Sequence, residues 1–98
     1  MTASGKNSAV HAQIFVSGRV QGVGYRAFVA QAASNHGVFG GVRNLEDGRV
    51  EVRVEGAKSA IEMLLEDLRR GPSASHVLKV EVEWSACADG CSSFSIWY

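Results

Sequence analysis

Apolar and polar side chains alternate along several stretches of this chain, and a period of two predicts β-strands with one buried face. The clearest stretch is 50–55, where three valines alternate with charged residues. Residues 10–17, 38–44 and 78–84 follow the same pattern, the second of them interrupted by glycines, and residues 94–98 predict a short last strand. The apolar positions of the fourth stretch are Leu78, Val80, Val82 and Trp84.

Two other stretches have apolar residues three and four positions apart, which is the spacing of one buried helix face. The first runs from Tyr25 to His36, and Gly37 follows it in the position where glycine commonly ends a helix. The second places an isoleucine and three leucines at this spacing between residues 61 and 68. Gly71-Pro72 ends it, because proline cannot continue a helix.

The order of these elements predicts an α+β domain with the ferredoxin-like split βαβ architecture. The order is βαββαβ plus a short C-terminal strand, with two helices on one face of a mainly antiparallel sheet. Glu46-Asp47-Gly48 predicts a tight turn that joins the second and third strands into a hairpin. This fold serves many functions, so the fold alone indicates no activity.

Length and composition indicate one globular domain over residues 10–98, preceded by a disordered tail over residues 1–9. Ten basic and ten acidic residues cancel, so no overall field attracts nucleic acid or a membrane surface, and neither is expected as a partner. No apolar run approaches the roughly 18 residues of a membrane span. We therefore expect a cytoplasmic monomer that acts on a small molecule.

The cysteines and histidines do not form a recognisable metal site. Cys87 and Cys91 flank an Asp-Gly turn, so they either face each other across a hairpin as a disulfide or remain free thiols, as is usual in a reducing compartment. The three histidines are scattered along the sequence. We expect neither a metal nor another cofactor.

The segment from Gly18 to Arg26 contains three glycines in seven positions and lies between the first strand and the first helix. Glycine lets the backbone turn tightly and bring its N–H groups close to a ligand. At a helix N-terminus such N–H groups favour an anion, and the Arg26 guanidinium could bind the same anion. The alternative is an ordinary glycine-rich turn with a solvated arginine.

Two nucleotide-binding motifs match this segment poorly. Gly22 to Ala27 fits the dinucleotide pattern G-x-G-x-x-A, with Glu46 and Asp47 about 20 residues further on. A doubly wound sheet, however, needs more strands and helices than this chain supplies. The segment also lacks the G-K-[ST] ending of a nucleotide P-loop.

Asn44 is a polar residue at the end of the second predicted strand. It is either a turn asparagine that bonds its own backbone or a side chain that holds a water molecule through its donor and acceptor together. Periodicity does not distinguish these interpretations.

Two long motifs in this sequence resemble the signature blocks of the acylphosphatase family. They are GRVQGVGYR, from Gly18 to Arg26, and GVRNLEDGRVEV, over residues 41–52. The similarity continues through Glu55-Gly56 and Gly71-Pro72 and covers about residues 11–84 in order.

The resemblance implies hydrolysis of an acyl phosphate to a carboxylate and inorganic phosphate without a metal. Arg26 and the backbone of the glycine loop would bind the phosphate, and Asn44 would orient the water that attacks phosphorus. The loop residues with this backbone role are Arg19, Val20, Gln21, Gly22, Val23, Gly24 and Tyr25. The alternative function is a non-catalytic anion-binding or regulatory module on the same fold.

The sequence departs from the family at Gly41, where an aromatic residue is common. Glycine weakens a strand interior, so we expect looser packing of the second strand near Asn44.

Overall fold

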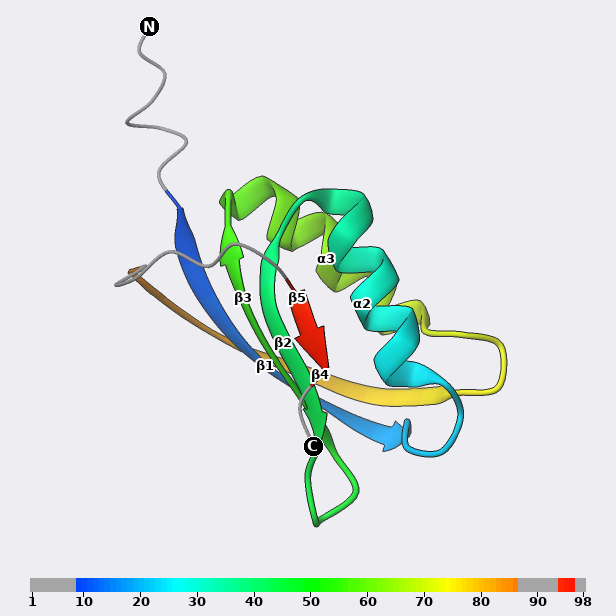
Figure 1. Ribbon diagram of the computed structural model, residues 1–98. Coiled ribbons are helices and arrows are strands. Elements are labelled where there is room, and N and C mark those ends of the chain that lie inside the picture. The colour runs from blue at the N-terminus through cyan, green and yellow to red at the C-terminus, as the bar shows by residue number, and fades with distance from the viewer. Residues whose placement is uncertain (1–8, 87–93, 97–98) are drawn as a thin grey trace, which may run out of the picture.

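The computed structural model describes residues 9–86 and 94–96 and has the predicted order of elements. These elements are β1 (Val10–Arg19), α2 (Tyr25–His36), β2 (Phe39–Asn44), β3 (Val50–Gly56), α3 (Lys58–Arg70), β4 (His76–Ala86) and β5 (Phe94–Ile96). The strands form one sheet in the order β4-β1-β3-β2-β5, in which only the β2–β5 pair is parallel. Both helices lie on one face of the sheet (Figure 1).

The ferredoxin-like split βαβ prediction is therefore confirmed. Cys87, Cys91 and all but the last residue of the expected N-terminal tail lie outside the described residues. No helix in the described ranges is long and apolar enough to cross a membrane.

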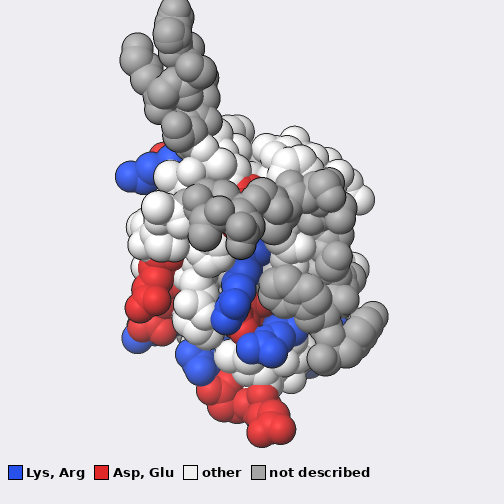
Figure 2. Space-filling model, turned by 60° about the vertical axis from the view of Figure 1, so that its left-hand side comes forward, with Lys and Arg blue, Asp and Glu red and all other residues white. Residues whose placement is uncertain are grey.

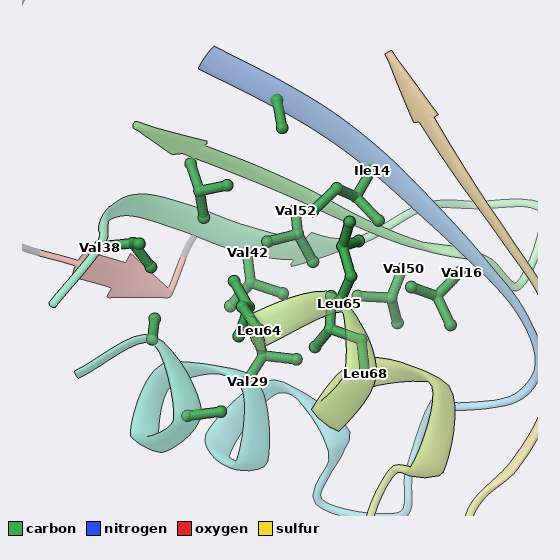
Figure 3. Close-up of a cluster of buried hydrophobic side chains, with 14 of the residues drawn as sticks. Ile14, Val16, Val29, Val38, Val42, Val50, Val52, Leu64, Leu65 and Leu68 are labelled. Atoms are coloured by element: carbon green, nitrogen blue, oxygen red, sulfur yellow. The ribbon is translucent and has the colours of Figure 1, made fainter. Parts of the chain in front are cut away.

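The core lies between the sheet and the two helices (Figure 3). The sheet contributes the inward residues of the alternating patterns, including Ile14, Val42 and Val52, all of which are fully buried. The helices contribute Val29 of α2 and the apolar stripe of α3, which contains Ile61, Leu64, Leu65 and Leu68. Burial of this apolar surface fixes the strand register, because a one-residue slip would turn every inward valine to the other face.

The alternation predicted for β4 is wrong at Leu78. Val80 and Val82 pack against the core as expected, but Leu78 is 72% exposed and Val77 takes the inward place. The register between β1 and β4 shifts at this point, since Ser17 pairs with Lys79 whereas the next residue pairs with Val77. A β-bulge inserts one unpaired residue, and that residue here is Leu78.

Trp84 also lies further from the core than the alternation predicts. It is 40% exposed, and the Lys58 ammonium lies 5.3 Å from the centre of its ring. β4 is an edge strand, so the tryptophan remains partly exposed there and contacts a cation.

The two adjacent glycines of β2 have different roles. Gly40 has φ of 144°, and a Cβ at this position would overlap the carbonyl oxygen of Arg53, so the close approach of β3 requires glycine. Gly41 is buried and pairs with Arg53. The ladder to β3 continues through both glycines from Phe39 to Asn44.

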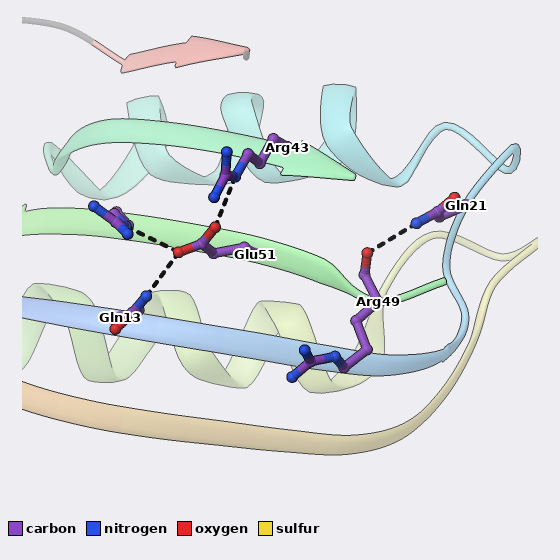
Figure 4. A network of polar contacts seen from close by, with 6 residues as sticks. Gln13, Gln21, Arg43, Arg49 and Glu51 are labelled. Carbon is purple, nitrogen blue, oxygen red and sulfur yellow. Dashed lines mark hydrogen bonds and ion pairs between the residues drawn. The ribbon is translucent and has the colours of Figure 1, made fainter. Parts of the chain in front are cut away.

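The helix-free face of the sheet contains a buried carboxylate, Glu51, which is 2% exposed. Its two oxygens accept hydrogen bonds from Gln13 at 2.7 Å, Arg43 at 2.7 Å and Arg53 at 2.9 Å (Figure 4). Burial alone raises the pKa of Glu51, but these hydrogen bonds and the charge of Arg53 outweigh it and hold the pKa at about 2. The network joins β1, β2 and β3 one residue before Asn44.

We expect acid to weaken this network. The pKa of Glu51 is lower in the folded protein than its ordinary value of 4.5. The stabilisation of the folded protein by ionised Glu51 is therefore complete above about pH 5 and is lost as the pH falls toward 2. The free energy of unfolding that is lost over this range is roughly 3 kcal/mol. Urea unfolding at several pH values should show that Glu51→Gln is less stable than wild type at pH 7 and that the difference shrinks on acidification.

Glu81→Gln, in an exposed pair with Lys79, is the matched control and should change little. A Glu51→Gln difference that is constant from pH 6 to 2 would contradict the assignment.

Candidate active site

The glycine loop joins the end of β1 to the start of α2 and occupies residues 20–24. Gly22 has φ of 73° and Gly24 has φ of 79°, both in the left-handed region that favours glycine. Gly24 is the N-cap of α2, and the first helix-internal bond runs from the N–H of Phe28 to its carbonyl. The backbone N–H groups of the first turn come before Phe28 in the chain and point out of the N-terminal end of the helix.

A pocket of about 200 Å³ lies at this helix end. Its lining residues are Val20, Gly22, Gly24, Tyr25, Arg26, Ala27 and Asn44. The pocket is smaller than the roughly 300–1,000 Å³ that holds a drug-sized ligand, so it suits one small group.

The electrostatics of the pocket favour an anion. The positive end of the α2 dipole faces it, and the first turn of α2 contains no acidic residue that would compete. Arg26, half-buried, adds a positive charge and a guanidinium with five N–H groups. A phosphate is an anion of the right size for this combination.

Asn44 reaches the same pocket from the end of β2. Its amide oxygen is buried and has no hydrogen-bond partner among the described residues. A turn asparagine that bonded its own backbone would use this oxygen, and no such bond is present among the described residues. The oxygen is therefore available to accept a hydrogen bond from a molecule in the pocket.

The β2–β3 turn beside Asn44 is closed mainly by the backbone. The N–H of Leu45 donates to the carbonyl of Arg49 at 2.8 Å, and the N–H of Gly48 donates to the carbonyl of Leu45 at 3.2 Å. Asp47 accepts from the backbone N–H of Arg49, which lowers the pKa of Asp47. Glu46 and Asp47 are exposed in the turn, where they do not line the pocket.

Tyr25 anchors the start of α2 to the end of α3. Its buried hydroxyl donates to the carbonyl of Leu68 at 2.7 Å, and burial raises the pKa of this hydroxyl, so it keeps its proton. Four residues after Leu68 stands Pro72, which has no N–H to continue the helical pattern. The tyrosine hydroxyl thus satisfies a carbonyl that the proline leaves without its helical donor.

Tyr25→Phe should therefore lower the free energy of unfolding by about 1–3 kcal/mol, because it leaves a buried carbonyl without this donor. The shift of the urea midpoint at constant slope measures the change. A change below about 0.5 kcal/mol, typical of an ordinary surface substitution, would contradict this role of the hydroxyl.

Charge elsewhere on the surface is mixed. On the face shown in Figure 2, basic and acidic side chains lie beside one another. Among the described arginines, Arg43 and Arg53 are paired with the buried Glu51 and Arg49 with the exposed Asp47. Within residues 9–86 and 94–96, no group of three or more His, Cys, Asp or Glu side chains has a geometry that could hold a metal ion.

The structure brings the two site segments predicted from the sequence into one pocket. Arg19 is the last residue of β1, and Val23 packs partly against the core, so neither lines the pocket. Gln21 also lies outside the lining, and its side chain faces the β2–β3 turn. Ala27, which the motif did not single out, does line it; its position in the first turn of α2 was the available signal.

Gly41, the departure from the family pattern, is not among the pocket residues. It lies opposite Arg53 in the ladder, on the side of the sheet that carries the Glu51 network.

Comparison with known proteins gives one consistent result. The family model described as acylphosphatase matches residues 12–96. An acylphosphatase of Thermus thermophilus is 49% identical over 82 residues, which is 84% of this chain and 92% of that protein. One of Methanococcoides burtonii is 45% identical over 85 residues, 87% of this chain and 88% of that protein. The crystal structure of acylphosphatase from Bacillus subtilis superimposes with a TM-score of 0.88 at 39% identity, covering 91% of this chain and 99% of the other.

Proposed function

Because this chain belongs to the acylphosphatase family, we propose that its pocket binds the phosphate of an acyl phosphate and directs a water molecule onto phosphorus. The enzyme is a hydrolase that converts an acyl phosphate and water into a carboxylate and inorganic phosphate. The roles of individual residues are our proposal, and one observation carries them. A single small pocket joins the N-terminus of α2, Arg26 and Asn44.

Arg26 and the amides of the loop and first turn hold the phosphate oxygens. Their charge and dipoles are in place before the reaction begins, so they stabilise the charge that spreads over these oxygens in the transition state. The acyl group lies outside the pocket, because 200 Å³ suits only the phosphate end of the substrate.

Asn44 holds the attacking water in line with the bond to be broken. The water oxygen bonds to phosphorus, the bond between phosphorus and the carboxyl oxygen breaks, and the carboxylate leaves with the electron pair. A carboxylate is a weak base, so it needs no proton from an acid on the protein. Positioning and charge stabilisation then suffice for the reaction.

The water proton passes to an oxygen of the substrate phosphate. An asparagine side chain does not titrate and cannot act as a general base. Among the described residues that line the pocket, Tyr25 keeps its phenolic proton because burial raises its pKa, and the Arg26 guanidinium has N–H donors but no acceptor atom. The substrate itself is the remaining acceptor.

Hydrolysis of benzoyl phosphate by the wild-type protein, with a chelator present, tests this function. Turnover well above the uncatalysed rate is the expected result. The second candidate is an anion-binding module, which would bind phosphate in the same pocket without turnover. Independence of metal, a monomeric state and a cytoplasmic location remain part of the proposal.

A further inference from the structure

The side chain of Gln21 connects the phosphate loop to the β2–β3 turn. Its amide nitrogen donates to the carbonyl of Leu45 at 2.7 Å and to that of Arg49 at 2.8 Å. Figure 4 shows this side chain reaching from the loop to the backbone of Arg49. Both contacts are partly buried and span more than 20 residues of sequence.

Each end of this connection adjoins the pocket. In the loop, Gln21 lies between Val20 and Gly22, which both line it. In the turn, Leu45 directly follows Asn44 and bonds the carbonyl of Arg49 through its own N–H. The two carbonyls that Gln21 binds therefore belong to the hydrogen-bonded pair that closes the turn beside Asn44.

We infer that Gln21 is a positioning residue that fixes the position of the phosphate loop relative to Asn44. This inference rests on the proposed function. The phosphate is bound by one segment and the water by another, so the angle and distance of attack depend on how the two segments sit together. A misplacement of about 1 Å in such an arrangement costs on the order of 100-fold in rate. The Gln21 amide provides both N–H groups needed to bind both carbonyls at once.

Gln21 acts through other groups rather than on the substrate. Its two N–H donors are directed to backbone carbonyls, and it is absent from the described lining of the pocket. Removing the side chain leaves Arg26 and the loop backbone able to bind phosphate. The expected defect is therefore in the rate of the chemical step and not in the affinity for phosphate.

The test compares Gln21→Ala and Gln21→Glu with wild type, in the wild-type and in the Asn44→Ala backgrounds. Glutamate keeps the length of the side chain but has no N–H to donate when ionised. Each substitution should lower kcat for benzoyl phosphate roughly 10- to 100-fold, whereas the inhibition constant of inorganic phosphate stays within about twofold. In the Asn44→Ala background, Gln21→Ala should have less than about a twofold further effect, because the position of the water no longer matters.

Gln31→Ala is the matched control, since Gln31 is exposed on α2 and bonds only Asn35 among the residues the structure describes.

Three results would overturn the inference. One is an unchanged kcat in the Gln21 variants. Another is a parallel loss of phosphate affinity, which indicates a collapsed loop. The third is full additivity with Asn44→Ala, which indicates independent action.

If Gln21→Ala fails to fold, Gln21→Met, which keeps the apolar stem of the side chain, replaces it in the same measurements. An inactive wild type would overturn the proposed function together with this inference, whereas any of the three results with an active wild type overturns the inference alone.

Discussion

Arg26→Ala should lower kcat/KM for benzoyl phosphate by at least about 10²–10³-fold, the effect of removing one preorganised donor from a developing charge. The loss should be larger in the transition state than in the ground state, because the proposed role of the guanidinium is to stabilise the charge that is spread over the equatorial phosphoryl oxygens of the transition state. Inorganic phosphate should also bind more weakly, since in the proposed mechanism the same guanidinium contacts product and substrate. Steady-state kinetics and phosphate inhibition measure both effects.

Arg26→Lys separates charge from geometry. Lysine restores a positive charge but not the planar pair of N–H donors, so it should recover phosphate affinity better than kcat. Arg69→Ala, an exposed residue of α3 away from the pocket, is the control. An Arg26→Ala enzyme that is folded and retains wild-type kcat/KM would contradict the assignment.

Asn44→Ala should lower kcat by about 10²–10³-fold and leave the inhibition constant of phosphate nearly unchanged. The reason is that, in the proposed mechanism, Asn44 contacts the attacking water, whereas the loop and Arg26 contact the phosphate. This separation of rate from affinity distinguishes the two residues in one set of kinetic measurements.

Asn44→Asp tests whether a carboxylate at this position, acting as a base, would speed the reaction. A carboxylate could accept the water proton, but it places a negative charge beside the bound phosphate. We expect Asn44→Asp to be at least as impaired as Asn44→Ala, and Asn35→Ala, on the exposed side of α2, to behave like wild type. A strong gain of activity in Asn44→Asp, growing above the pKa of the new carboxyl, would contradict this expectation and would show that a protein base at this position takes the water proton better than the substrate phosphate does.

The fold could be predicted from the sequence because each element carries its own local signal. The alternating valines of β3, the leucine stripe of α3 and the helix stop at Gly71-Pro72 depend only on neighbouring residues. Leu78 could not be placed correctly in this way. Alternation has no mark for a bulge, and the bulge follows from how β4 pairs with the end of β1.

From the residues alone, the candidate site was predictable as two separate motifs, and only the family resemblance implied that they act together. Nothing local in the sequence shows that Asn44 meets the glycine loop, and periodicity could not choose between the two interpretations of Asn44. Only the tertiary structure shows that this amide oxygen is buried at the pocket with no hydrogen-bond partner in the described part of the chain, and this supports the proposal that it binds water. The contacts of Gln21 with Leu45 and Arg49 are equally invisible, because they join segments more than 20 residues apart.

The most direct test of the mechanism is hydrolysis of benzoyl phosphate by the wild-type enzyme in water enriched in oxygen-18, with chelator present and with the uncatalysed reaction measured alongside. If the pocket directs water onto phosphorus, each enzymatic turnover places one labelled oxygen in inorganic phosphate and none in benzoate. Label in the benzoate would mean that water attacks the acyl carbon, and the roles proposed for Arg26 and Asn44 would then be wrong.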